Sequence, residues 1–306
     1  MKVLLEAVFS PTFAASILRV TTPILFATLG AVVADLAGVV NIALEGMMLV
    51  SAFTGVAVSA FTGSAWIGLI CGVAVASALG LLLGYFHLKL RTNIILAGIA
   101  LNLLATEGTV FLLYIVAHDK GVSSSLASKV IPDWQIPIIK DIPVLGAMVG
   151  KQNALTYLSL LAVGVVYLFL YKTPLGLRLR AVGENPDAAD SVGISVHKVQ
   201  FIALAISGAL AGMGGAHLSM GYVSWFSRNM TSGRGFIALA AEALGRRHPV
   251  GGFIASLFFG LADALSNYMQ SLRVPGEFVQ MIPYLLTLFA LAVYSGRQMK
   301  TRRSFK

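Results

Sequence analysis

The sequence is poor in the residues that build reactive or metal-binding sites. Only one of its 306 residues is a cysteine, Cys71, which lies inside an apolar run, so no internal disulfide can form and packing is its expected role. The five histidines are scattered along the chain without the spacing of metal ligands. We therefore expect neither a metal site nor a catalytic thiol.

Motifs for nucleotide binding and hydrolysis are also missing. The nearest approach to a phosphate-binding loop, residues 146–152, lacks the required spacing and the Ser or Thr. No Gly-x-Ser-x-Gly elbow occurs, and acids, bases and nucleophiles are not clustered. We predict that the chain is not an enzyme and binds no cofactor, and that a different chain binds any nucleotide that drives it.

Charged residues are scarce, at 11% of the chain against 57% hydrophobic residues. A soluble domain of this length could not hide so much apolar surface, so the composition indicates an integral membrane protein. The net charge of +9 could suggest nucleic acid, but the basic residues form short clusters between apolar runs and no groove. We therefore expect the lipid bilayer, and no nucleic acid, as a partner.

The basic clusters predict the orientation. Four of them hold thirteen of the 22 Lys and Arg residues, and the positive-inside rule places these four in the cytoplasm. They are Lys89 and Arg91; Lys172, Arg178, Arg180 and Lys198; Arg246 and Arg247; and Arg297, Lys300, Arg302, Arg303 and Lys306. Counting crossings back from the last cluster predicts a cytoplasmic C-terminus and an external N-terminus.

The apolar runs predict an all-α, polytopic helical bundle of about eight to ten helices in a single domain, residues 1–306. Spans are expected at residues 13–34, 47–61, 66–88, 93–117, 154–171, 199–222, 251–270 and 280–294. Residues 35–46 and 235–244 are interrupted or too short to span, which is typical of re-entrant segments or half-helices. Residues 118–151, with balanced charge and three prolines, predict an external loop.

A weak internal repeat relates residues 13–117 to residues 199–296. Asn41 to Glu45, NIALE, echoes Phe236 to Glu242, FIALAAE, which would give Glu45 and Glu242 corresponding places. Matching short segments in two halves point to the transport site of repeat-built transporters. The small-residue bias of membrane helices could also produce such an echo by chance.

Isolated polar residues inside the spans are candidates for a translocation path, because they are costly in a bilayer. Asp263 and Asn267 lie on one helix face, and Asn102 and Thr106 repeat that spacing in an earlier span. The full candidate set is Asn41, Glu45, Asn102, Thr106, Phe236, Glu242, Asp263 and Asn267. The alternative is that these residues only hold the bundle together, through interhelical hydrogen bonds or, for Glu242, a salt bridge with Arg246.

Residues 172–198 form the long polar interruption between two spans. Within it, Asn185 can cap a helix, Pro186 suits the first helical position, and Gly193 can close the far end. Asp187 would favour the positive end of the helix dipole. A helix from Pro186 to Val192 would be about 10 Å long, too short to be stable alone, so we expect it to dock against a partner.

Three motifs carry a resemblance to a known family. They are residues 38–46, GVVNIALEG; residues 176–189, GLRLRAVGENPDAA; and residues 233–240, GRGFIALA. On these motifs the chain resembles permease subunits of ATP-driven (ABC) importers, the family of ribose-type sugar, branched-chain amino acid and nucleoside permeases. The likeness covers nearly the whole chain and is greatest to the shorter of the two permeases in nucleoside importers.

This resemblance implies that residues 183–193 contain the coupling helix, which seats in a cleft of the ATPase. The residues that it assigns to this contact are Gly183, Glu184, Asn185, Pro186, Asp187, Ala188, Ala189 and Gly193, with the two alanines keeping the docking face small. Residues 243–249 depart from the family pattern, which leaves the local cytoplasmic contact open.

The resemblance also implies the partners and the location. A second, longer permease, a cytoplasmic ATPase that binds ATP and Mg, and an external lipoprotein that captures nucleosides are expected in a bacterial plasma membrane. Simple sugars such as ribose are the alternative cargo, and branched-chain amino acids are a more distant one.

A second class of function is a stand-alone carrier driven by an ion gradient. It is motivated by acidic residues at membrane depth: Asp35, Glu45, Glu107, Glu242 and Asp263.

Overall fold

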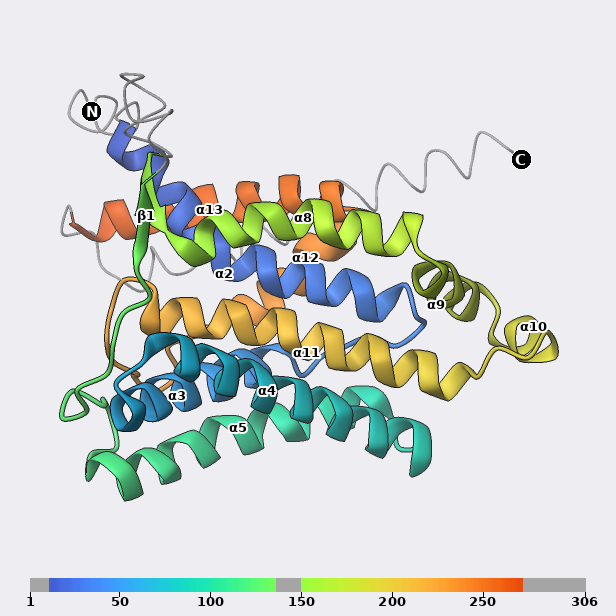
Figure 1. Ribbon diagram of the computed structural model, residues 1–306, viewed down its shortest axis with the longest axis horizontal. Helices are drawn as coiled ribbons and strands as arrows, with labels where there is room; N and C mark the ends of the chain where they lie inside the picture. Colours follow the sequence, from blue (N-terminus) through green and yellow to red (C-terminus); the bar gives the residue numbers. More distant parts are fainter. Residues whose placement is uncertain (1–10, 136–149, 272–306) are drawn as a thin grey trace.

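The computed structural model describes residues 11–135 and 150–271, which form a bundle of helices with roughly parallel long axes (Figure 1). Within these residues, seven helices are long and apolar enough to cross a membrane. They are α2 (Pro11–Asp35), α3 (Leu44–Thr62), α4 (Ala65–Gly84) with the π-helical turn η1 (Tyr85–Lys89), α5 (Ile94–Ala117), α8 (Ala154–Lys172), α11 (Val196–Met220) and α13 (Pro249–Ser271). Three shorter helices are α9 (Pro174–Glu184), α10 (Pro186–Ser191) and α12 (Arg234–Leu244).

The prediction of an all-α membrane bundle with a short helix near residue 240 is therefore confirmed. The expected span at 280–294 and the last basic cluster lie outside the described residues. Inside the interval expected to be a loop, β1 (Asp133–Gln135) pairs antiparallel with β2 (Lys151–Asn153). Strands of three residues are too short to show an alternating pattern, so this ribbon could not be predicted from the sequence.

Side-chain caps fix where several helices begin. The Asn93 side chain accepts from the backbone N–H groups of Ile95 and Leu96 at 2.9 and 3.3 Å, and starts α5. Asn153 caps α8 in the same way, through Leu155 N–H at 3.0 Å. Such caps satisfy backbone donors that a helix start leaves unpaired.

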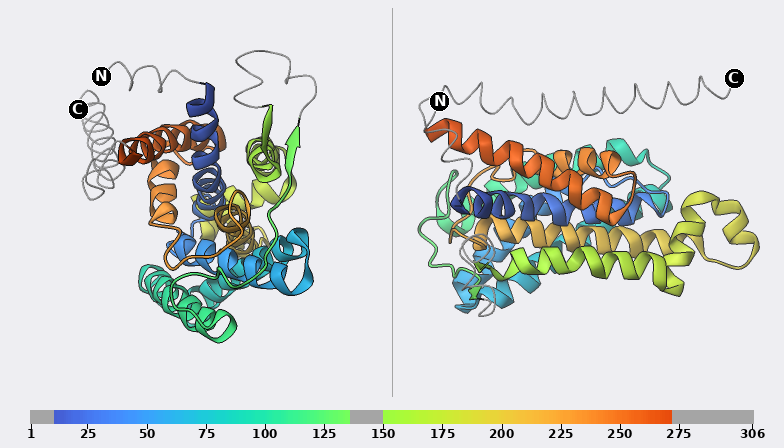
Figure 2. Two further views of the ribbon diagram at one scale, coloured as in Figure 1. Left: turned by 90° about the vertical axis from the view of Figure 1, so that its left-hand side faces the viewer. Right: turned by 90° about the horizontal axis from the view of Figure 1, so that it is seen from above.

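Helix α11 lies in the middle of the bundle, with the other helices around it (Figure 2, left). Glycines let its neighbours approach closely. A Cβ at Gly215 would lie 1.9 Å from the carbonyl oxygen of Met48 in α3, and one at Gly80 in α4 would lie 2.3 Å from that of Leu204. Close backbone approach at small residues is the usual basis of helix packing in membranes.

Two breaks divide the chain into halves of opposite direction. After α2, residues 36–43 run back as coil toward the middle of the bundle before α3 begins (Figure 1). After α11, which runs opposite to α2, residues 221–233 return in the same way before α12 begins. We call these coils the first break and the second break.

The two similar sequence segments, residues 41–45 and 236–242, lie at different positions relative to their helices. Glu45 is the second residue of α3, whereas Glu242 is the third residue from the end of α12, so the two acids do not occupy corresponding places. The shared Ile-Ala-Leu triplet spans the end of the first break and the first residue of α3 in one segment, whereas it lies inside α12 in the other. In both segments a break is followed by a helix start, and the internal repeat itself stays a prediction.

The two ends of the bundle differ in composition. At the end that carries α10 lie Lys89, Arg91, Lys172, Arg178, Arg180, Lys198, Arg246 and Arg247. At the end that carries the β1–β2 ribbon lie the three tryptophans, Trp66, Trp134 and Trp225, each between 43% and 53% exposed. We call these the α10 end and the ribbon end.

Candidate functional site

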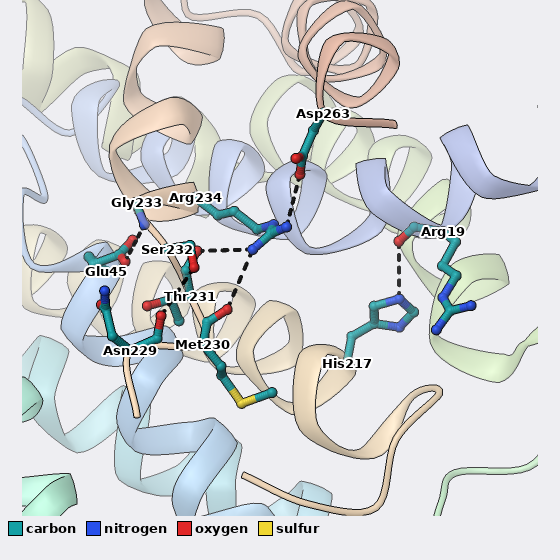
Figure 3. Close-up of polar contacts among 10 residues, drawn as sticks. All are labelled: Arg19, Glu45, His217, Asn229, Met230, Thr231, Ser232, Gly233, Arg234 and Asp263. Atoms are coloured by element: carbon teal, nitrogen blue, oxygen red, sulfur yellow. Dashed lines mark hydrogen bonds and ion pairs between the residues drawn. The ribbon is translucent and has the colours of Figure 1, made fainter. Parts of the chain in front are cut away.

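The first turns of α3 and α12 meet inside the bundle, and the Glu45 carboxylate joins them. Its two oxygens accept hydrogen bonds from the backbone N–H groups of Gly233 and Gly235, each at 2.7 Å. Figure 3 shows the contact with Gly233. Gly233 has a φ of 79°, and its missing Cβ leaves the helix start open to the carboxylate. A negative side chain from one helix therefore caps the positive end of the other. We call this contact the junction.

Glycine at position 235 is required by the same contact. A Cβ there would lie 2.5 Å from the backbone nitrogen of Glu45, so α12 can approach α3 only without a side chain at this point. The two breaks thus end at one place, although Glu45 and Gly233 are 188 residues apart in the sequence.

Asn102 and Asn41 hold the first break on the other side of the junction. The Asn102 side chain accepts from Gly46 N–H at 2.8 Å and donates to the carbonyl oxygen of Ile42 at 2.9 Å. Asn41 donates to Ser207 Oγ at 2.8 Å. Asn41, Glu45 and Asn102 are each at most 8% exposed. These three candidates therefore have hydrogen-bond partners inside the molecule, as the structural alternative expects, and their part in a translocation path stays a prediction.

Asp263 also has a partner inside the chain. Its carboxylate pairs with the Arg234 guanidinium at 2.9 Å and so joins α13 to the start of α12 (Figure 3). Arg234 also donates to the carbonyl oxygens of Met230 and Thr231, at 3.4 and 3.3 Å. Arg234 was not among the predicted site residues. A lone arginine between Gly233 and Gly235 in an apolar region could have indicated a buried ion pair.

The other candidates differ in exposure. Phe236 is 48% exposed on α12, and Thr106 donates to the carbonyl oxygen of Asn102 at 2.9 Å within α5. Asn267 is exposed and lines a cavity of about 380 Å³ between α2, α11 and α13. Phe236 and Asn267 are thus the candidates that reach the surface.

Two residues that the sequence did not single out, Arg19 and His217, line the same cavity. The Arg19 guanidinium lies 3.7 Å from the centre of the Tyr222 ring. His217 Nε2 is 3.3 Å from the carbonyl oxygen of Arg19, a contact that requires the proton on Nε2 (Figure 3).

Glu242 lies at the α10 end of α12, apart from the junction. Its neighbours there are Asp35 at the end of α2 and Arg247. Arg247 forms an ion pair with Asp35, and both Arg246 and Arg247 have positive φ, 56° and 58°. Arg247 lies in residues 243–249, the segment where the sequence departs from the family pattern.

Helices α9 and α10 form a projection beyond the other helices (Figure 2, right). The Asn185 side chain accepts from Ala188 N–H at 3.0 Å, Pro186 occupies the first turn, and Gly193 has a φ of 82°. The capped short helix expected from the sequence is therefore present, one residue shorter, at Pro186–Ser191. Helix α9 before it was not anticipated, although Thr173 caps it through Gly176 N–H at 3.1 Å.

The exposed face of α10 differs from the expectation in one residue. Ala189 is 4% exposed and packs inward, so it cannot belong to a docking face. Glu184, Asn185, Pro186, Asp187, Ala188 and Gly193 are exposed, and Val192 is 75% exposed at the tip. An apolar side chain at the tip of a polar projection is a better docking residue than Ala189.

The projection touches the first break directly. A Cβ at Gly183, in the last turn of α9, would lie 2.1 Å from the carbonyl oxygen of Leu36. Gly38, with a φ of 77°, faces Gly183 from the other side of this contact. The Gln200 side chain adds a hydrogen bond to the carbonyl oxygen of Ala37 at 3.3 Å. A displacement of α9 and α10 would therefore reach the first break at Leu36 and, eight residues later, the start of α3 at Leu44.

Comparisons with known proteins agree with this architecture. Residues 13–291 match the family described as "Branched-chain amino acid transport system / permease component". The chain is 33% identical over 294 residues to the nucleoside ABC transporter permease protein NupC of Lactococcus lactis, with 92% of each chain covered. It is 36% identical over 288 residues to the guanosine ABC transporter permease protein NupQ of Bacillus subtilis, covering 90% of this chain and 89% of NupQ.

A third relative is named for the transport of a different cargo. The chain is 38% identical over 271 residues to TsgC13 of Haloferax volcanii, provisionally assigned as a glucose ABC transporter permease, with 86% of this chain and 80% of TsgC13 covered. Among solved structures, PsaBC from Streptococcus pneumoniae in complex with Fab has a similar fold, with a TM-score of 0.53 at 14% identity over 94% of both chains.

Proposed function

The chain belongs to the family of branched-chain amino acid transport system permease components and is a permease subunit of an ABC importer, and we propose that its cargo is a nucleoside. In this proposal it forms half of the translocation path in a bacterial plasma membrane. The α10 end faces the cytoplasm, in agreement with its basic residues, and the ribbon end with its tryptophans faces outward.

The contact between Gly183 and Leu36 carries the mechanical part of the proposal. A cytoplasmic ATPase that grips the exposed face of α10 would displace α9, whose last turn is packed against the first break. The first break leads to Glu45 and so to the junction with α12. ATP and Mg belong to the ATPase, and the work of ATP binding reaches the path through this chain of contacts.

Replacing Asn185 with alanine tests the coupling role. Loss of the cap is expected to destabilise α10 by about 1 kcal/mol and to lower ATP-driven uptake several-fold, whereas Asn185→Ser should retain most of it. The measurement is uptake per ATP hydrolysed by the complete complex in proteoliposomes. Asn93→Ala is the matched control, because it removes a cap of the same kind from a different helix, α5. Unchanged coupling in the correctly assembled double variant Asn185→Lys, Pro186→Gly would contradict the role.

The choice of nucleosides rests on the relatives. Two of those reported above are named for nucleoside and guanosine transport, while the third is assigned to glucose, so a simple sugar is the second candidate. We propose that a second, longer permease completes the path and that an external lipoprotein delivers the cargo. The gradient-driven carrier finds little support, since Glu45, Asp35 and Asp263 are held by partners within the chain.

An uptake assay separates the cargoes. The complex of this chain with its second permease, ATPase and lipoprotein should accumulate radiolabelled guanosine when ATP is inside the vesicles, and an uncoupler should not abolish it. A hundredfold excess of unlabelled inosine is expected to suppress uptake at least tenfold, and the same excess of ribose or glucose to change it less than twofold. Uptake of a sugar without uptake of any nucleoside would overturn the choice of cargo.

A further inference from the structure

One face of helix α5 is exposed on the outside of the bundle. It is the least buried of the seven candidate spans, with 28% of its apolar stretch inside the molecule. At 100° per residue, one stripe of this face contains Leu96, Ala100, Leu103, Leu104, Glu107, Phe111 and Tyr114. The leucines and Phe111 are between 60% and 68% exposed, so the stripe is open to whatever surrounds it. We call it the α5 stripe.

A carboxylate stands in the middle of this stripe. Glu107 is 13 residues from Ile94 and 10 from Ala117, which places it about 20 and 15 Å from the two ends of α5 and near the middle of the membrane. Its side chain is 69% exposed. A charge at this depth facing acyl chains is strongly unfavourable, and such residues face water-filled cavities or other protein. The α5 stripe is therefore unsuited to lipid, although its other residues are apolar.

Arg228 on the second break is placed beside Glu107. The guanidinium lies 3.8 Å from the carboxylate and is 58% exposed. The backbone behind it is fixed, because Arg228 N–H donates to the carbonyl oxygen of Gly121 at 2.8 Å and Phe226 N–H donates to Ser123 Oγ at 2.8 Å. A long, exposed ion pair leaves most of the five guanidinium donors and the carboxylate acceptors available to a third molecule.

The position of this pair relates it to the junction. The second break carries Arg228 from the ribbon end of α11 down to Gly233, where Glu45 caps α12. Figure 2 (left) shows α5, α12 and α13 along one side of the bundle, with α4 and α8 on the other. Phe236, 48% exposed, is the third residue of α12 and directly follows Gly235 of the junction. Arg228, the basic partner of the exposed ion pair, thus belongs to the second break, which ends at the junction.

We propose that the α5 stripe and Arg228 face the water-filled path shared with the second permease, and that Glu107 and Arg228 bind the base edge of a 6-oxopurine nucleoside as it passes. A guanidinium suits the O6 and N7 acceptors of guanine, and a carboxylate accepts from the N–H donors of the same base. The identity of the cargo in this inference rests on the proposed function. The assignment of the α5 stripe to the path rests on the exposed charge of Glu107 near the middle of the membrane.

Cysteine accessibility tests the placement without using transport. Because Cys71 is the only cysteine, a Cys71→Ser background makes each introduced thiol unique. In the assembled complex, Leu103→Cys, Glu107→Cys and Phe111→Cys are expected to react with a positively charged methanethiosulfonate at least tenfold faster than Leu161→Cys in α8. Leu161 is 61% exposed, against 64% for Leu103, but its helix has no charged residue between Ala154 and Tyr171. Rates within twofold of Leu161→Cys would overturn the placement.

A selectivity measurement tests the binding role. Glu107→Gln and Arg228→Ala are each expected to reduce guanosine uptake about tenfold relative to uptake of a pyrimidine nucleoside, with the complex still assembled. An equal loss for both nucleosides, or no loss, would overturn the role in base recognition. If the wild-type complex transports no nucleoside, the proposed cargo fails, whereas the accessibility result still decides whether the α5 stripe faces water.

Discussion

Replacing Glu45 with alanine is expected to abolish uptake and to destabilise the chain by about 3 to 5 kcal/mol. The Glu45 carboxylate accepts two backbone hydrogen bonds at 2.7 Å, and hydrogen bonds to a charged group are worth about 1.5 to 3 kcal/mol each. Alanine leaves the half-buried N–H group of Gly233 and the buried N–H group of Gly235 without an acceptor at the start of α12. The melting temperature of the purified complex and its uptake rate measure the effect.

Glu45→Gln is the matched variant for this experiment. Glutamine keeps one accepting oxygen but turns an NH₂ group toward the second backbone N–H, so about half of the stability loss is expected. If Glu45 acted only by carrying charge through the path, alanine and glutamine would lower uptake equally and leave the melting temperature unchanged. That result would contradict a capping role.

Replacing Gly183 with alanine is expected to lower coupled uptake at least tenfold while the ATPase still binds. The new Cβ would lie 2.1 Å from the carbonyl oxygen and 2.8 Å from the carbonyl carbon of Leu36, both backbone atoms that cannot rotate away. Overpacking of this kind costs about 1 to 3 kcal/mol, and here it would separate α9 from the first break. Uptake per ATP hydrolysed and co-purification of the ATPase are the measurements.

Gly164→Ala in α8 provides the control. A Cβ at Gly164 would meet no atom within 4 Å, and alanine favours a helix interior over glycine by about 1 kcal/mol. The same chemical change should therefore leave uptake unchanged at this position. Full coupling in Gly183→Ala would show that the contact with Leu36 does not transmit force.

Local signals in the sequence predicted much of the fold. Runs of apolar residues predicted the spans, and the Asn185, Pro186 and Gly193 pattern predicted α10, because caps and helix stops depend on residues within one turn. The same reasoning overlooked α9, since the apolar run before it and the polar loop after it obscured the Thr173 cap.

Contacts between distant residues could not be predicted in this way. Glu45 was singled out as a polar residue at membrane depth, but its partners are the backbone of residues 188 and 190 positions away, which carry no side chain to recognise. For Glu107 the exposure in the folded chain was the missing information. In the sequence it resembles Asp263, which Arg234 neutralises at 2.9 Å.

The junction also sets the order in which the chain can mature. Ribosomes add about 5 to 20 residues per second, so Gly233 is synthesised about 10 to 40 s after Glu45, its partner 188 residues earlier. During that interval the first half must reside in the membrane with an unsatisfied carboxylate. Seating of α12 on Glu45 is then a late step of biogenesis, which follows the synthesis of Gly233.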